Sequence, residues 1–99
     1  MTIYEHTTSL LTQAGSTSTV TLNVRGGLCR QILVRANTDS TVFRVDLQDD
    51  RPVTRLNFGF HTGELNEVGL AFPMAGRYTL NITNASPNDT FRILMAVQE

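Results

Sequence analysis

The sequence predicts an all-β fold, a seven- to eight-stranded antiparallel β-sandwich of Greek-key or jelly-roll topology. Three observations support this prediction. Apolar and polar residues alternate along several short segments, as in "TVFRVDLQ", which is typical of half-buried strands. Turn-forming residues separate these segments at intervals of roughly 8–13 residues. No window shows the sustained 3.6-residue periodicity of an amphipathic helix.

Each predicted strand presents one set of apolar side chains to the core. The inward residues in chain order are Val20, Leu22 and Val24; Ile32, Val34 and Ala36; Phe43, Val45 and Leu47; Leu56, Phe58 and Phe60; Val68, Leu70 and Phe72; Tyr78, Leu80 and Ile82; and Phe91, Ile93, Met95 and Val97.

The predicted turns lie between these segments. Residues 26–27 form a Gly-Gly pair typical of a tight hairpin, and Gly or Pro also interrupts the chain at residues 49–52 and 73–76. Before the first strand, residues 1–16 have a weak core pattern and are predicted to form an N-terminal arm or an irregular edge strand. Residues 17–99 are predicted to form the β-sandwich domain.

Composition limits the classes of function. The chain has 99 residues, a hydrophobic content of 40% and a net charge of −1, so it fits one globular domain without the charge expected for binding nucleic acid or an anionic membrane. No apolar run approaches the length of a membrane span, and the N-terminus lacks the pattern of a signal peptide. The single Cys29 excludes an internal disulfide, so we expect synthesis in a reducing cytoplasm.

Few residues have the spacing that catalysis requires. Cys29 with His6 or His61 is a conceivable nucleophile and base, but no flanking motif supports the pair, and a buried apolar thiol is the favoured interpretation. Glu64 and Glu67 are a paired-carboxylate candidate for a glycosidase, which a chain without Trp makes improbable. We therefore expect no enzyme activity, and a small hydrolase remains only a remote alternative.

No metal or cofactor site is predicted. Asp46, Asp49 and Asp50 cluster around a turn, but they lack the spacing of a calcium loop and are expected to be solvated turn carboxylates. The two histidines lack zinc-ligand spacing, and the scattered glycines form no phosphate-binding loop.

All eight basic residues are arginines, which are enriched in protein interfaces, although GC-rich codon usage explains the bias equally well. On strands they would form basic ladders across one sheet face or, as favoured, pair across strands with Asp46, Glu64 or Glu67. Residues 81–90 contain three Asn-x-Ser/Thr triplets, which are better explained as a polar connection between two strands than as glycosylation sites.

The stretch "AGRYTLNITN", residues 75–84, resembles the closing hairpin of small β-sandwich modules. Bacterial pre-peptidase C-terminal domains and some carbohydrate-binding sandwiches have this pattern. By size and type, the compact, Lys-free, Thr-rich chain also resembles the head decoration, or cement, proteins of tailed bacteriophages. That resemblance implies a sandwich on the capsid exterior, often as a trimer, held by an N-terminal arm or sheet edge.

From these resemblances and the missing catalytic groups, we expect a non-enzymatic virion structural protein that binds and stabilises an assembled phage capsid. The expected partner is the major capsid protein or another large assembly, with a possible homotrimer. The expected location is the capsid exterior of the virion, after synthesis in the host cytoplasm. The alternative is a carbohydrate-binding β-sandwich module that uses Tyr4, His61 and Asn66. The predicted partner-binding residues are Ile3, Tyr4, Leu10, Leu11, Arg51 and Arg55.

Overall fold

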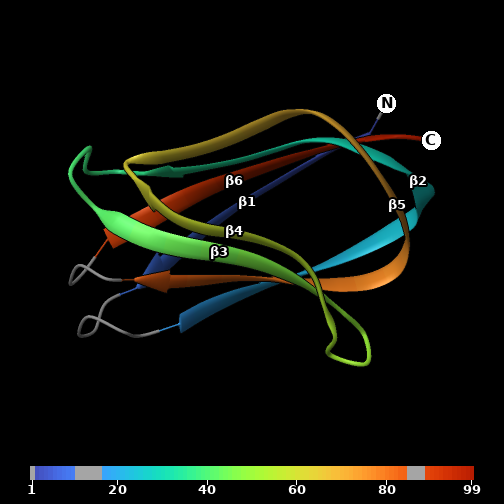
Figure 1. Ribbon diagram of the computed structural model, residues 1–99, viewed down its shortest axis with the longest axis horizontal. Coiled ribbons are helices and arrows are strands. Elements are labelled where there is room, and N and C mark those ends of the chain that lie inside the picture. Colours follow the sequence, from blue (N-terminus) through green and yellow to red (C-terminus); the bar gives the residue numbers. More distant parts are fainter. Residues whose placement is uncertain (1, 11–16, 85–88) are drawn as a thin grey trace.

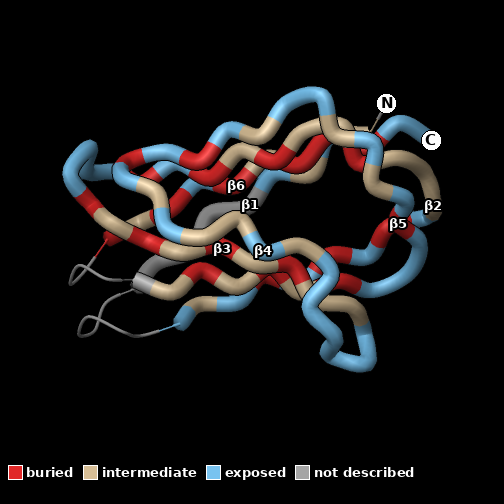
Figure 2. The backbone as a smooth tube through the Cα atoms, in the orientation of Figure 1, coloured by how far each residue is buried: buried red, intermediate tan, exposed pale blue. Residues whose placement is uncertain are grey.

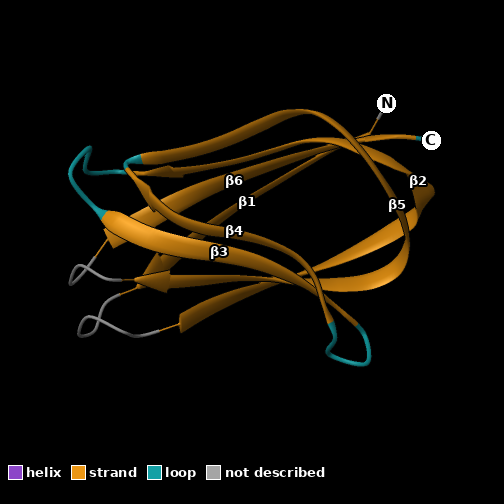
Figure 3. Ribbon diagram, in the orientation of Figure 1, coloured by secondary structure: helices purple, strands orange, loops and turns teal. Residues whose placement is uncertain are grey.

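The computed structural model describes residues 2–10, 17–84 and 89–99, and these form six strands joined by turns, with no helix among them (Figure 3). The strands pair antiparallel in one sheet of order β1-β6-β2-β5-β3-β4. The prediction of an all-β antiparallel fold is therefore confirmed. The strands are β1 (Thr2–Leu10), β2 (Thr17–Ala36), β3 (Val42–Asp49), β4 (Thr54–Thr62), β5 (Glu64–Asn84) and β6 (Asp89–Gln98).

The predicted count of seven to eight strands is wrong, because two of the predicted turns are bends within long strands. β2 continues through residues 26–27, and β5 continues through residues 73–76. The two bends coincide, since the register between β2 and β5 shifts between Val24 and Gly27. Both strands bend together at the right-hand end of Figure 1. A Gly-Gly pair permits a bend in a continuing strand as readily as a reversal, so the local sequence does not decide between them.

The common bend divides the sheet into two halves. The β6 half consists of β1, β6, residues 28–36 of β2 and residues 64–73 of β5. The β3 half consists of β3, β4, residues 17–24 of β2 and residues 76–84 of β5. β2 and β5 are therefore shared by both halves.

Buried side chains from both halves belong to one core cluster. Buried positions alternate with more exposed ones along β3, as predicted (Figure 2). Phe43 of β3 and Phe91 of β6 are fully buried and meet edge to face, with ring centroids 5.1 Å apart and an interplanar angle of 66°. β3 and β6 are not neighbours in the strand order, so this contact shows that side chains of the two halves meet in one core.

Bulges make two of the predicted core assignments wrong. On β4 the register jumps from Val45–Gly59 to Asp46–Asn57, so the alternation reverses and Phe60 lies outside, 60% exposed. On β5 the register with β2 shifts at Gly69, and Val68 lies outside, 65% exposed. An inserted residue exchanges the inward and outward positions beyond it. A prediction that assumes strict two-residue alternation misses this exchange.

β1 is a regular edge strand. Its register with β6 is unbroken from Thr2–Val97 to Leu10–Asp89. Tyr4 packs against the core from this strand. Residues 2–10 of the predicted arm are therefore part of the sheet, whereas residues 11–16 lie outside the described residues.

Candidate functional site

Cys29 and His61, the catalytic candidates with described side chains, lie on strands that are not neighbours in the sheet, β2 and β4. Cys29 is fully buried, its thiol lies 3.7 Å from the carbonyl oxygen of Gln31, and burial raises its pKa. His61 lies on β4 and its Nε2 is 2.8 Å from the carbonyl oxygen of Phe58. The side chain of His6 is outside the described residues. A buried, protonated thiol fits the structural interpretation of Cys29.

The acidic turn between β3 and β4 has a structural role. Asp49 Oδ1 accepts hydrogen bonds from the backbone N–H groups of Arg51, at 3.0 Å, and Val53, at 2.9 Å. These bonds, led by that of Val53, lower the pKa of Asp49, and the guanidinium groups of Arg51 and Arg55 add to the effect. Asp46 instead accepts a hydrogen bond from Asn81 on β5 at 2.8 Å. Within the described ranges, no group of three or more His, Cys, Asp or Glu side chains is arranged to hold a metal ion.

The predicted partner-binding residues do not form one cluster. Arg51 and Arg55 lie near the β4 edge of the sheet. Arg51 Nη2 is 3.8 Å and Arg55 Nη1 is 3.7 Å from Asp49 Oδ2. Ile3 and Tyr4 lie on β1, the opposite edge, where Ile3 is 49% exposed and Tyr4 packs on the core. The other two predicted residues are Leu10, whose side chain is outside the described part of the structure, and Leu11, which lies outside the described residues.

The residues of the carbohydrate alternative are also dispersed over three strands. Tyr4 is on β1, His61 is on β4, and Asn66 is on β5. Asn66 accepts a hydrogen bond from Gln31 on β2 at 3.0 Å. Asn66 and Tyr4 belong to strands of the same half, but Tyr4 points toward the core and Asn66 is exposed.

The outer face of the β6 half carries apolar side chains in neighbouring rows of the sheet. One row runs Ile3, Ala96, Gln31, Val68 from β1 to β5. The next row has Leu94 and Leu33 at its centre. We call Ile3, Leu33, Val68 and Leu94 the apolar patch. Ile3 and Val68 are 49% and 65% exposed, and the two leucines are half-buried.

The corresponding outer face of the β3 half is polar. Its three exposed or half-buried rows carry mainly Thr, Asn and Gln side chains, and Phe60 is its large exposed apolar residue, 5.9 Å from the Cζ of Arg44. The two outer faces therefore differ in character although one pair of strands runs through both. The polar side chains are Thr17, Thr19, Thr21, Thr79, Asn81, Thr83, Asp46, Gln48, Thr54 and Asn57.

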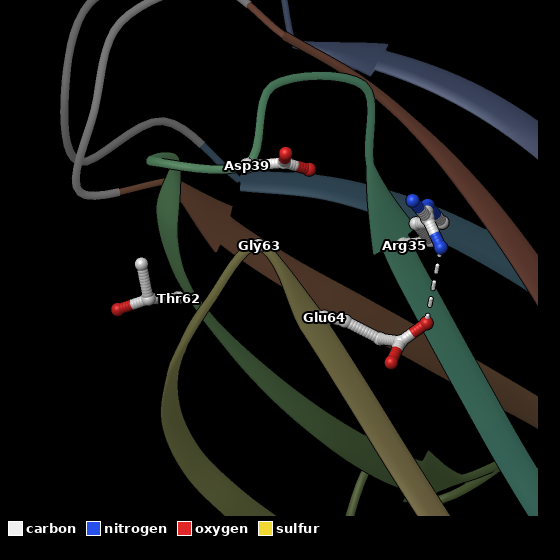
Figure 4. Close-up of a pocket in the computed structure, with 5 residues that line it drawn as sticks. All are labelled: Arg35, Asp39, Thr62, Gly63 and Glu64. Carbon is white, nitrogen blue, oxygen red and sulfur yellow. Dashed lines mark ion pairs between the residues drawn. The ribbon is translucent and has the colours of Figure 1, made fainter.

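Arginines face one another in the row that follows the apolar patch. Arg35 on β2 and Arg92 on β6 are direct cross-strand partners, and Glu64 on β5 is the next partner of Arg35. Arg35 Nη1 lies 3.6 Å from Glu64 Oε1 (Figure 4). The predicted pairing of an arginine with Glu64 is confirmed, and a short basic ladder exists beside it.

Two hollows adjoin this row. One, of about 390 Å³, is lined by Arg35, Ala36, Asn37, Thr90 and Arg92. The other, of about 280 Å³, is lined by Arg35, Asp39, Thr62, Gly63 and Glu64 (Figure 4). Arg35 lines both, so its guanidinium lies at the centre of the charged end of the β6 half.

Asp89 holds this end of the molecule together. Its side chain accepts hydrogen bonds from the hydroxyl of Thr41, from the N–H of Thr38 at 3.2 Å and from the N–H of Thr90 at 2.7 Å. Burial alone would raise the pKa of Asp89, but these hydrogen bonds, with one from Asn37, lower it on balance. The turn that carries Asn37 and Asp39 is thereby fixed against β6.

Gly63 joins β4 to β5 under the same turn. Its N–H donates to the carbonyl of Thr41 at 2.8 Å, and its carbonyl accepts from Ala36 at 2.9 Å. Its φ is +77°, and a Cβ there would lie 2.6 Å from the carbonyl oxygen of Asp39. Only glycine combines this conformation with this close approach.

We expect Gly63→Ala to lower the free energy of unfolding by about 2–4 kcal/mol, because left-handed strain and backbone overlap add. The matched control is Gly69→Ala, where φ is +74° and no atom lies within 4 Å of the added Cβ. The control should lose only about 1–2 kcal/mol from strain. Urea denaturation of both variants measures the difference, and equal losses would contradict the close approach.

Comparison with known proteins shows a similarity of fold to solved structures and no match in sequence. No family model matches the chain, and no curated protein matches it. Among solved structures, the Yersinia pseudotuberculosis-derived mitogen aligns with a TM-score of 0.55 at 10% identity, covering 99% of this chain and 87% of the mitogen. The Aeromonas hydrophila periplasmic inhibitor of g-type lysozyme aligns with a TM-score of 0.56 at 16% identity, covering 97% and 86%.

A third structure, a family two carbohydrate esterase from Cellvibrio japonicus, aligns at 11% identity with a TM-score of 0.47 and is covered over only 35% of its length. At these identities the likenesses concern the fold alone. The chain therefore has a small all-β fold similar to those of the mitogen and the lysozyme inhibitor.

Proposed function

We propose that this chain is a non-enzymatic binding protein that docks a protein partner through the outer face of its β6 half. The apolar patch carries this proposal. Ile3 and Val68, 49% and 65% exposed, flank the half-buried Leu33 and Leu94 on a surface where an antiparallel sheet normally presents polar residues to water. Ile3 and Val68 lie at the two ends of one row, and Leu94 and Leu33 connect them diagonally through the next row. A run of apolar side chains on an outer face is a common mark of a protein-binding surface.

The contrast between the two outer faces supports this choice of surface. One strand, β2, supplies Thr19 and Thr21 to the polar face and Leu33 to the apolar patch. The apolar character of the β6 half is therefore not a general property of the outward positions of this strand. Burial of the patch against a partner removes apolar area from water, which is the main favourable term in most protein association.

We also propose that the two facing halves make the fold a β-sandwich. The edge-to-face contact of Phe43 and Phe91 across the core supports this arrangement. In a sandwich, each layer has an inner face in the core and an outer face in solvent. The β6 half would then present the docking face as its whole outer surface.

An assembled phage capsid is the proposed form of the partner, on the resemblance in size and type to head decoration proteins. A protein that binds the assembled shell but not its free subunits stabilises the shell by mass action. β1 is an end strand of the sheet formed by the described residues, and this edge would extend the contact by strand addition. This location on a virion stays a prediction.

A photo-cross-linking residue placed at position 68 tests the docking face, with the same residue at the exposed position 21 of the polar face as control. With assembled capsids, position 68 should cross-link the major capsid protein, and Ile3→Ser should reduce the yield at least fivefold because the patch loses apolar area. Equal products from positions 68 and 21 would contradict the proposal. Cross-links only between copies of the chain would replace the capsid with a second copy as partner.

A further inference from the structure

The geometry points to a carboxylate of the partner protein as the group that binds between Arg35 and Arg92, at the end of the apolar patch. This inference rests on the proposed docking face and names the chemistry of what docks there. The partner surface would be apolar opposite Leu33 and Leu94 and would carry an Asp or Glu one row away.

The two arginines are placed unfavourably for the isolated protein. They are direct cross-strand partners on β2 and β6, and like charges in that position destabilise a sheet. Only Arg35 has an ion pair with a described side chain, Glu64 at 3.6 Å. Because these two side chains are 62% and 44% exposed, water screens that pair strongly. The same water also weakens the repulsion between the two exposed guanidinium groups, so the free protein bears a small net cost that Glu64 offsets only in part.

The other carboxylates near Arg35 and Arg92 form no ion pair with Arg92 among the described side chains. Asp89 is buried, and its oxygens accept hydrogen bonds from Thr41, Thr38 and Thr90. Asp39 lines the smaller hollow with Glu64 and is not among the residues that line the hollow of Arg92. Glu5 lies one row away on β1, opposite Leu94, and no ion pair between Glu5 and Arg92 is present among the described side chains.

The space and the donors fit a carboxylate. The hollow of about 390 Å³ lies between Arg35 and Arg92 and is open to an approaching group. Two guanidinium groups offer planar pairs of N–H donors, which match the two oxygens of a carboxylate. When a partner covers the neighbouring apolar patch, water is excluded and the ion pairs become stronger than they are on an exposed surface. The two arginines and the apolar patch therefore both fit a partner protein surface that carries a carboxylate beside apolar side chains.

The direct test is an NMR titration that follows the Nε–Hε signals of the arginines. The probe is the peptide acetyl-Leu-Glu-Leu-Glu-Leu-amide, and its control is the same peptide with Gln in place of Glu. We expect the Glu peptide to shift the signals of Arg35 and Arg92 and to bind at least fivefold more tightly than the Gln peptide. Arg92→Gln should remove this preference, whereas Arg77→Gln, at an exposed position on the polar half, should retain it.

Equal affinity for the two peptides would overturn the carboxylate inference while leaving apolar docking in place. Inorganic phosphate is titrated separately. If phosphate shifts the Nε–Hε signals of Arg35 and Arg92 as much as the Glu peptide does at equal concentration, the assignment to a protein carboxylate is overturned. Failure of the docking face itself is recognised independently by the cross-links from position 68.

A stability measurement separates this role from a structural one. Without partner, Arg92→Gln should raise Tm by about 1–4 °C, because it removes a like-charge pair. A lower Tm for this variant would show that Arg92 stabilises the free protein, which would overturn the argument from unrelieved repulsion.

Discussion

Phe43→Ala is expected to lower the free energy of unfolding by about 3–5 kcal/mol, the range for removing a buried aromatic ring. Phe43 is fully buried, and its ring meets Phe91 with centroids 5.1 Å apart. The ring connects β3 of one half with β6 of the other, so its loss leaves a cavity where the halves meet. Urea denaturation followed by circular dichroism measures the change.

The same substitution on the surface is the control. Phe60→Ala removes an equal ring that is 60% exposed on β4, and we expect a loss of less than about 1 kcal/mol. A double-mutant cycle between Phe43 and Phe91 should give a coupling energy of about 0.5–1.5 kcal/mol for the edge-to-face contact. Comparable losses at positions 43 and 60 would contradict the burial of Phe43 in the core.

Asp89→Ala should cost about 2–4 kcal/mol at neutral pH, because it leaves buried donors without an acceptor. The affected donors are the hydroxyl of Thr41 and the N–H groups of Thr38 and Thr90. Asp89→Asn should cost less, because it keeps one acceptor oxygen, although it also directs an NH₂ group toward donors. The control Asp50→Asn, at an exposed turn position, should have little effect.

The effect of Asp89 should depend on pH with a definite sign. Its hydrogen bonds make the pKa of Asp89 lower in the folded protein than in the unfolded chain. The unfolded chain therefore takes up the proton first, and the stabilisation is fully present above about pH 4 and is lost as the pH falls through the folded pKa. The difference between wild type and Asp89→Asn should shrink steadily below about pH 4. A difference that stays constant from pH 7 to pH 2 would contradict this account.

The sequence predicted the core better than the connections. Alternation identified Leu22, Phe43 and Leu80 as core residues, because a strand with one buried face needs an apolar residue at every second position. The same rule failed at Phe60 and Val68, where a bulge reverses the alternation. It also counted β2 and β5 twice, since glycine allows a bend and a reversal alike.

The charged end could not be predicted from the sequence. Asp89 lies 51 residues from Thr38, and Arg92 becomes the partner of Arg35 only through the order of β6 beside β2. Local patterns carry no information on which strands become neighbours. The ion pairs of Arg51 and Arg55 with Asp49 are local in sequence, and a role of these two arginines in partner binding stays a prediction.

The common bend of β2 and β5 has a consequence for how the molecule forms and comes apart. Each of these strands passes through both halves, so the two halves share one continuous pair of strands and one core. We therefore expect a single cooperative transition. The pairing joins residues 17–36 with residues 64–84, and the large loop that must close first places the protein among slow folders, on a time scale of milliseconds to seconds.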